Sequence, residues 1–276
     1  MKIILILLFL LSINVTLASS VDTVIIRSEK MKKDIKCVVI KPQSYTEKNH
    51  AFPVVYLLHG HGGDYSNWIR RVPDLKKYAD LYQILIVCPD GHNSSWYFDS
   101  PLDSSMYYET YIAREVPAFI EKHFKTIPSR NARAITGLSM GGHGALSIAW
   151  NHAGYFGAVG SMSGVVDINI RRNSFDLAKR IGDTVLYKEN WRNYSVINLV
   201  EKKPVDSLAI IIDCGVKDLF FNSNRRLHEK LLLLNVEHDY SEKPGGHNWN
   251  YWSNSIQYHL LFFRNYFDKM KLSVRD

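Results

Sequence analysis

Cysteine is scarce in this 276-residue chain, which has only three: Cys37, Cys88 and Cys214. A small, odd number excludes the dense disulfide framework that stabilises many small secreted domains. Each cysteine lies within or at the end of an apolar run, so we expect three buried thiols. The core must then come from hydrophobic burial, and a chain of this length with 46% hydrophobic residues can supply it. No repeat or low-complexity segment interrupts the sequence.

Long hydrophobic runs are missing after the first twenty residues, so we expect no membrane span in the rest of the chain. The N-terminus is different: Met1-Lys2 precedes the apolar residues 3–11 and then Ala18-Ser19-Ser20. A short positive start, an apolar stretch and a small-residue end are typical of a secretory signal peptide. We predict a signal peptide over residues 1–20 and an exported, soluble mature protein. An uncleaved N-terminal anchor is the alternative.

Charge of one sign is not concentrated anywhere, although the chain has a formal net charge of +7. The basic clusters are short, scattered and not interleaved with aromatic residues, as a nucleic-acid surface would be. They are Lys30 to Lys33, Arg70-Arg71, Arg171-Arg172 and Lys202-Lys203. We therefore expect no nucleic-acid partner and leave the oligomeric state open.

Short apolar runs alternate with helical patterns along the chain. The predicted strands are Val24–Ile26, Cys37–Ile40, Val54–Leu58, Ile84–Cys88, Arg133–Thr136, Gly157–Met162, Leu208–Ile212 and Glu237–Glu242. Apolar residues at helical spacing mark residues 108–124, where Pro117 predicts a kink, and residues 252–267. The sequence thus predicts an α/β fold, with a mostly parallel sheet covered on both faces and an N-terminal antiparallel hairpin. We expect one domain over residues 21–276, with residues 164–206 as an insertion over the sheet.

The most informative motif is Gly137-Leu138-Ser139-Met140-Gly141, between a predicted strand and a predicted helix. A G-x-S-x-G in that position is the nucleophile elbow, a sharp turn that exposes the serine hydroxyl above the sheet. The glycines are needed because side chains there would strike neighbouring elements. Ser139 is therefore the candidate nucleophile. The non-catalytic alternative is a surface turn that carries a solvated serine.

Serine needs a base and an acid to orient that base, and in this fold type they follow the nucleophile in the order acid, then histidine. His247 is the only downstream histidine in a loop after the last predicted strand. For the acid, Asp213 continues a strand directly and Asp218 lies in the loop beyond it. We favour Asp218 and expect Asp213 to bond nearby amides as a structural residue.

The third requirement is an oxyanion hole, which the glycine-rich segment 57–63 can supply together with the amide of Met140. His59 and His61 in this segment invite a zinc interpretation, but no third ligand has suitable spacing. We predict no metal and no cofactor.

These motifs together resemble the Putative esterase (esterase D-like) family of α/β-hydrolases. The matching segments are residues 56–63 with Trp68, residues 87–91, 137–146 and 161–164, and Gly246-His247-Asn248-Trp249. The resemblance implies an α/β-hydrolase fold, Ser139, Asp218 and His247 as catalytic residues, and the amides of His61 and Met140 as the oxyanion hole. The chain departs from relatives at residues 152–156, away from the expected chemistry.

The hypothesis is a secreted serine carboxylesterase acting on short-chain esters, or on acetyl or feruloyl groups of polysaccharides. Gly60, Trp96 and Trp249 are the candidate substrate-binding residues. Aromatic residues elsewhere in 96–98 and 187–194 could stack on a sugar or pack in the core. The alternatives are an acyltransferase to a sugar alcohol, a thioesterase resembling S-formylglutathione hydrolases, and a catalytically silent carbohydrate-binding protein.

Overall fold

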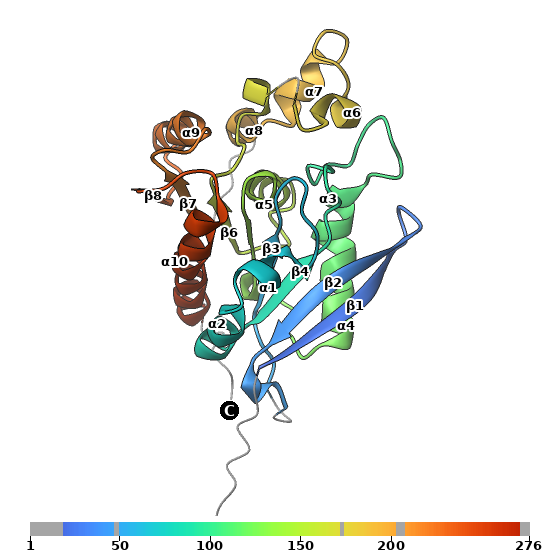
Figure 1. Cartoon of the computed structure of the whole chain (residues 1–276), viewed down its shortest axis with the longest axis vertical. Coiled ribbons are helices and arrows are strands. Elements are labelled where there is room, and N and C mark those ends of the chain that lie inside the picture. Colours follow the sequence, from blue (N-terminus) through green and yellow to red (C-terminus); the bar gives the residue numbers. More distant parts are fainter. Residues whose placement is uncertain (1–18, 47–49, 172–173, 203–207, 271–276) are drawn as a thin grey trace, which may run out of the picture.

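A computed structural model describes residues 19–46, 50–171, 174–202 and 208–270 (Figure 1). The predicted signal peptide lies outside the described residues, apart from Ser19 and Ser20. Arg172 and Lys203 of the basic clusters also lie outside them. Within these ranges, every helix is too short or too polar to cross a bilayer.

The strands form one sheet of eight, in the order β1-β2-β4-β3-β5-β6-β7-β8. β2 runs antiparallel to both of its neighbours, and all other pairs are parallel. The strands are β1 Ser20–Ser28, β2 Lys33–Lys41, β3 Val54–Leu58, β4 Leu85–Pro89, β5 Arg133–Gly137, β6 Ala158–Met162, β7 Ala209–Gly215 and β8 Asp239–Lys243. All eight predicted strands are present, and the antiparallel hairpin is confirmed as β1 and β2. Both hairpin strands are longer than predicted. Polar residues on their partly exposed face interrupt the apolar runs from which the strands were predicted.

Helices cover both faces of the sheet. One face packs against α3 Tyr108–Thr110, α4 Val116–His123, α5 Met140–Asn151, α8 Val196–Lys202 and α9 Phe221–Leu233. The other packs against α1 Asn67–Arg71, α2 Leu75–Tyr82 and α10 Trp249–Lys269. Strands buried on both sides explain the continuous apolar runs. The short helices α6 Leu177–Ile181 and α7 Lys188–Asn193 lie with α8 at one end of the molecule (Figure 1).

The predicted helix over residues 108–124 is interrupted. A π-helical turn, η2 Tyr111–Glu115, separates α3 from α4. Pro117 at the start of α4 has no N–H, so the Ala113 carbonyl lacks its α-helical donor and the backbone widens. The 3₁₀ segments in the described residues are η1 Gln43–Thr46, η3 Arg130–Ala132 and η4 Ile168–Arg171.

All three cysteines are free and buried, as expected. Burial raises the pKa of Cys214 and Cys88, which makes their thiolates unfavourable. These thiols pack as small hydrophobic side chains.

Candidate active site

Ser139 stands at a strained turn between β5 and α5. Its backbone has φ 54° and ψ −116°, a combination that non-glycine residues rarely adopt. A Cβ on Gly137 would lie 2.6 Å from the carbonyl carbon of Gly141, and one on Gly141 would lie 2.6 Å from the carbonyl oxygen of Leu58. The two glycines therefore let β3, the turn and α5 approach closely enough to hold Ser139 at the tip.

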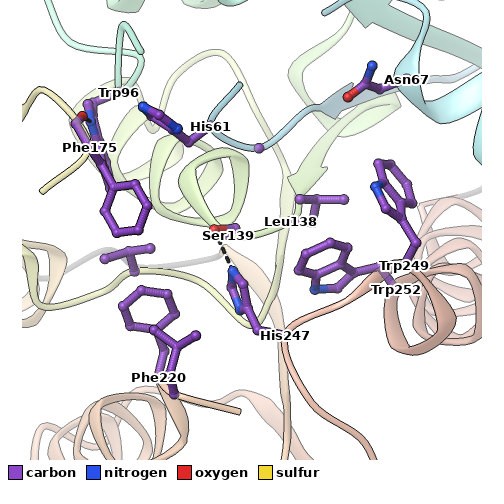
Figure 2. Close-up of a pocket in the computed structure, with 13 residues that line it drawn as sticks. His61, Asn67, Trp96, Leu138, Ser139, Phe175, Phe220, His247, Trp249 and Trp252 are labelled. Atoms are coloured by element: carbon purple, nitrogen blue, oxygen red, sulfur yellow. Dashed lines mark hydrogen bonds between the residues drawn. The ribbon is translucent and has the colours of Figure 1, made fainter. Parts of the chain in front are cut away.

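Ser139, His247 and Asp218 form one hydrogen-bonded chain, and Figure 2 shows its contact between Ser139 and His247. His247 Nε2 lies 2.9 Å from Ser139 Oγ, and His247 Nδ1 lies 2.9 Å from Asp218 Oδ2. A carboxylate can only accept, so Nδ1 carries the proton and the neutral ring leaves Nε2 free to accept from the Ser139 hydroxyl. Geometry and tautomer together allow the imidazole to take a proton from the serine.

Asp218 is fixed by a second donor. Its other carboxylate oxygen, Oδ1, accepts the backbone N–H of Phe220 at 2.8 Å. The side chain is fully buried in the loop between β7 and α9. The loop that carries His247 is tied to this one, because the Lys217 N–H donates to the Gly245 carbonyl at 2.8 Å.

The His247 ring lies among aromatic side chains. The rings of Phe220 and Trp252 meet it edge-on, with centroids 5.0 and 4.9 Å away. After His247, Asn248 caps α10: its side chain accepts the Tyr251 N–H at 3.2 Å. The ring is thus held by packing on two sides and by the start of a long helix.

Asp213 is the structural carboxylate that we expected, but its partners are side chains and not amides. It is buried in β7 and accepts from Tyr251 Oη at 2.8 Å, His259 Nε2 at 2.9 Å and the Ser255 hydroxyl, all on α10. Burial raises the pKa of Asp213, but the hydrogen bonds from His259 and Ser255 outweigh it and leave the pKa below its ordinary value. Thr136 of β5 completes the network through His259 Nδ1, at 2.9 Å.

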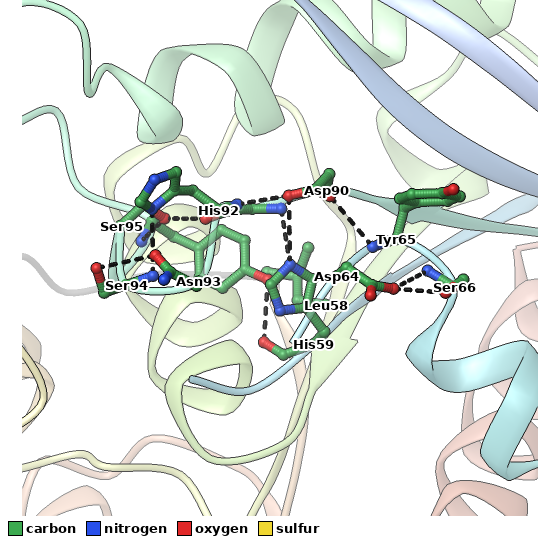
Figure 3. Close-up of polar contacts among 12 residues, drawn as sticks. Leu58, His59, Asp64, Tyr65, Ser66, Asp90, His92, Asn93, Ser94 and Ser95 are labelled. Carbon is green, nitrogen blue, oxygen red and sulfur yellow. Dashed lines mark hydrogen bonds and ion pairs between the residues drawn. The ribbon is translucent and has the colours of Figure 1, made fainter. Parts of the chain in front are cut away.

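The segment after β3 is held in place by His59 (Figure 3). Its Nδ1 donates to the Gly60 carbonyl and its Nε2 accepts from the Gly91 N–H, each at 2.8 Å. Burial lowers the pKa of His59, which favours this neutral ring. Both ring nitrogens are used by backbone groups, so His59 and His61 do not form a pair of free ligands.

Among the described residues, the N–H groups of the two predicted oxyanion donors lack acceptors, whereas those of Gly62 and Gly63 have them. The Gly62 N–H donates to the Asn93 carbonyl at 2.7 Å, and the Gly63 N–H donates to the Gly60 carbonyl at 3.1 Å. Within the described ranges, the N–H groups of His61 and Met140 have no such acceptor. These two donors are therefore available to a bound group.

A pocket of about 200 Å³ opens above Ser139 and His247 (Figure 2). All three predicted substrate-binding residues, Gly60, Trp96 and Trp249, line it, as does His61. Sequence reasoning missed other lining residues, which are Asn67, Leu138, Val165, Phe175, Leu219, Phe220 and Trp252. Asn67 follows the glycine-rich segment 57–63 and Trp252 follows the His247 motif, so the sequence contains a signal for both. No motif lies beside Phe175 to mark it as part of a site.

Most of the other candidate stacking aromatics are packing residues. Tyr97 and Phe98 are buried, and Trp191 is buried with its Nε1 donating to the Gly182 carbonyl at 2.9 Å. Tyr194 contacts the Phe98 ring at a centroid distance of 4.5 Å. The insertion reaches the pocket through Val165 and Phe175, and the Phe175 carbonyl accepts from Trp96 Nε1 at 2.8 Å.

A family model described as Putative esterase matches residues 28–263. The chain belongs to this family. The membership confirms the resemblance seen in the motifs, and the eight-stranded sheet confirms the predicted α/β-hydrolase fold.

Two curated relatives show how far the similarity extends. An esterase of Mycobacterium tuberculosis is 30% identical over 243 residues, which are 76% of this chain and 51% of that protein. The chain therefore spans about half the length of that relative. An acetyl esterase of Caldicellulosiruptor saccharolyticus is 27% identical over 251 residues, 83% of this chain and 92% of that protein.

Solved structures give the same fold. A ferulic acid esterase has a TM-score of 0.80 and 27% identity, covering 91% of this chain and 99% of its own. An S-formylglutathione hydrolase from Agrobacterium tumefaciens has a TM-score of 0.79 at 22% identity, over 91% of this chain and 97% of its own. The second likeness is one of fold alone.

Proposed function

We propose that this protein is a serine carboxylesterase in which Ser139 is the nucleophile, His247 the base and Asp218 the acid. The observation that carries the proposal is the chain of two 2.9 Å contacts from Ser139 through His247 to Asp218, at the floor of a pocket. Family membership supports the same chemistry. The amides of His61 and Met140 are the proposed oxyanion donors, because neither N–H group has a hydrogen-bond acceptor among the described residues.

The reaction follows from this geometry. His247 Nε2 takes the Ser139 proton as Oγ bonds to the ester carbonyl carbon, and the carbonyl electron pair moves onto the oxygen between the two amides. The bond to the alcohol then breaks, and the alcohol leaves with the proton from His247. Water attacks the acyl-enzyme, gives its proton to His247, and releases the acid as Ser139 regains its proton.

The proposed substrates are uncharged esters of short-chain or aromatic acids, including acetyl or feruloyl groups carried by polysaccharides. The pocket is small and lined by Trp96, Trp249 and other apolar side chains, and among the described residues no Lys, Arg, Asp or Glu side chain lines it. Two relatives are named as acetyl and ferulic acid esterases, which supports this substrate class. We also propose that residues 1–20 direct export and that residues 21–276 form one domain, with residues 164–206 over the site.

The test is hydrolysis of p-nitrophenyl acetate by the wild type and by Ser139→Ala. We expect a loss of at least about 10³-fold in kcat with an unchanged melting temperature, because the nucleophile is removed and no packing is lost. The matched control is Ser161→Ala, which removes another glycine-flanked serine whose buried hydroxyl has no hydrogen-bond partner in the described residues. A fluorophosphonate should label the wild type at Ser139. Substantial activity in Ser139→Ala would refute the assignment.

A further inference from the structure

The strand β8 is an open edge of the sheet. It pairs with β7 on one side, and no described strand pairs with its other side. The Val216 N–H donates to the Lys243 carbonyl at 2.9 Å, so the backbone groups of Lys243 face β7. Because these groups alternate along a strand, those of Tyr240 and Glu242 face outward. Unpaired outward N–H and C=O groups are a template for another strand.

A groove with apolar side chains on its α10 side lies beside this edge. It has a volume of about 580 Å³ and runs between β8 and α10. Tyr258, Leu261 and Phe262 line it from α10, and the first two are exposed. Lys243 of β8 also lines it, with its ammonium group 3.7 Å from the centroid of the Tyr258 ring. The groove therefore offers apolar surface next to free backbone donors and acceptors.

The charges along β8 favour pairing with a second copy of the same strand. In an antiparallel pair of β8 strands, residues whose backbone groups face outward must lie opposite each other. One residue of the strand therefore lies opposite its own copy, at the twofold axis. An axis at Ser241 sets Tyr240 opposite the partner subunit's Glu242, with exchange of backbone hydrogen bonds. It also sets Asp239 opposite the partner subunit's Lys243. An axis at Glu242 would instead place two glutamates opposite each other.

Asp239 is the residue left without a counter-charge. It is exposed and has no ion pair among the described residues, whereas Glu242 already pairs with Arg225 at 2.6 Å. The axis at Ser241 therefore supplies the missing partner charge at the one unpaired position on the strand.

We propose that two copies of this chain associate through β8, centred on Ser241, to join their sheets into one. A five-residue strand is too short to form a stable interface alone, since specific interfaces bury about 800 Å² on each partner. The exposed Leu261 and Tyr258 of the two α10 helices supply the remaining apolar contact. Unlike the proposed function, this inference does not depend on Ser139.

The axis predicts a specific cross-link. Ser241 would lie opposite its own copy in a pair that does not exchange hydrogen bonds, where Cα atoms are about 4.5 Å apart and within disulfide range. We expect Ser241→Cys to form a covalent dimer under mild oxidation, visible on a non-reducing gel. The control is Asp239→Cys, which faces the same side but lies too far from its copy to cross-link. The three native cysteines are buried and do not compete.

Association itself is measured by sedimentation velocity of the full chain over a concentration series. We expect the wild type to show twice its 31.8 kDa mass. Asp239→Lys, which opposes two cations, should raise the dissociation constant at least about tenfold, and Leu261→Asp should raise it further. Glu29→Lys, a charge reversal on the distant hairpin, should leave it unchanged. A monomer at all concentrations would overturn the proposal, as would a dimer insensitive to Asp239→Lys and Leu261→Asp, or equal cross-linking of both cysteine variants.

Discussion

Replacing Asp218 by Asn should remove activity by forcing the wrong tautomer on His247. The Phe220 N–H, 2.8 Å from Asp218 Oδ1, requires an acceptor at that position. An asparagine must therefore place its carbonyl oxygen there and turn its NH₂ group toward His247. The NH₂ group can only donate, so Nδ1 becomes the acceptor and the proton moves to Nε2. With Nε2 protonated, His247 cannot accept the Ser139 proton.

We expect a fall in kcat of about 10⁴-fold, the loss seen when a triad acid is replaced by its amide, which corresponds to about 5 kcal/mol of barrier. The assay is p-nitrophenyl acetate hydrolysis at saturating substrate, with the melting temperature measured alongside. Asp213→Asn makes the same chemical change on the neighbouring carboxylate, so it is the matched control. That variant should lose stability, by about 3–5 kcal/mol, because it breaks a buried hydrogen-bonded pair. A kcat in Asp218→Asn above about a tenth of wild type would refute the tautomer argument.

The remaining predictions concern the pocket wall, acid stability and the elbow. Phe175→Ala should enlarge the pocket and raise the kcat/KM ratio of p-nitrophenyl hexanoate to acetate, on the order of tenfold, and an unchanged ratio would exclude Phe175 as a wall. The pKa of Asp213 is lowered on folding, so its contribution to stability is present above its ordinary pKa of 3.8 and lost as pH falls below that value. The difference in urea midpoint between wild type and Asp213→Asn should accordingly shrink in acid, and a constant difference would contradict this. Gly141→Ala should destabilise by about 1–3 kcal/mol and impair activity, because its Cβ meets the Leu58 carbonyl at 2.6 Å; normal values for both would show that the turn can relax.

The sequence predicts those parts of the fold that have a local physical cause. Each buried strand is a continuous apolar run because helices cover both of its faces. Ser139, Asp218 and His247 are identifiable because the turn chemistry and the carboxyl ends of parallel strands place them at one edge. Their geometry is as expected, and their catalytic roles stay a prediction.

Other features depend on contacts that no local pattern records. The partners of Asp213 lie on α10, 38 to 46 residues away in the chain, so only the packed structure identifies them. Phe175 reaches the pocket because the insertion folds back onto Trp96, and Trp191 does not because it packs inside the insertion. An aromatic residue in the sequence looks the same in either role.

The Asp213 network also has a consequence for synthesis of the chain. Its carboxylate lies in β7, but Tyr251, Ser255 and His259 lie on α10 and leave the ribosome after all eight strands of the sheet. A nascent chain that has completed the sheet therefore still lacks the main donors of this carboxylate, which stays in contact with water until α10 packs over it. His247 contacts Ser139 across 108 residues of chain and lies just before α10, so the site can be assembled only after this segment has been made.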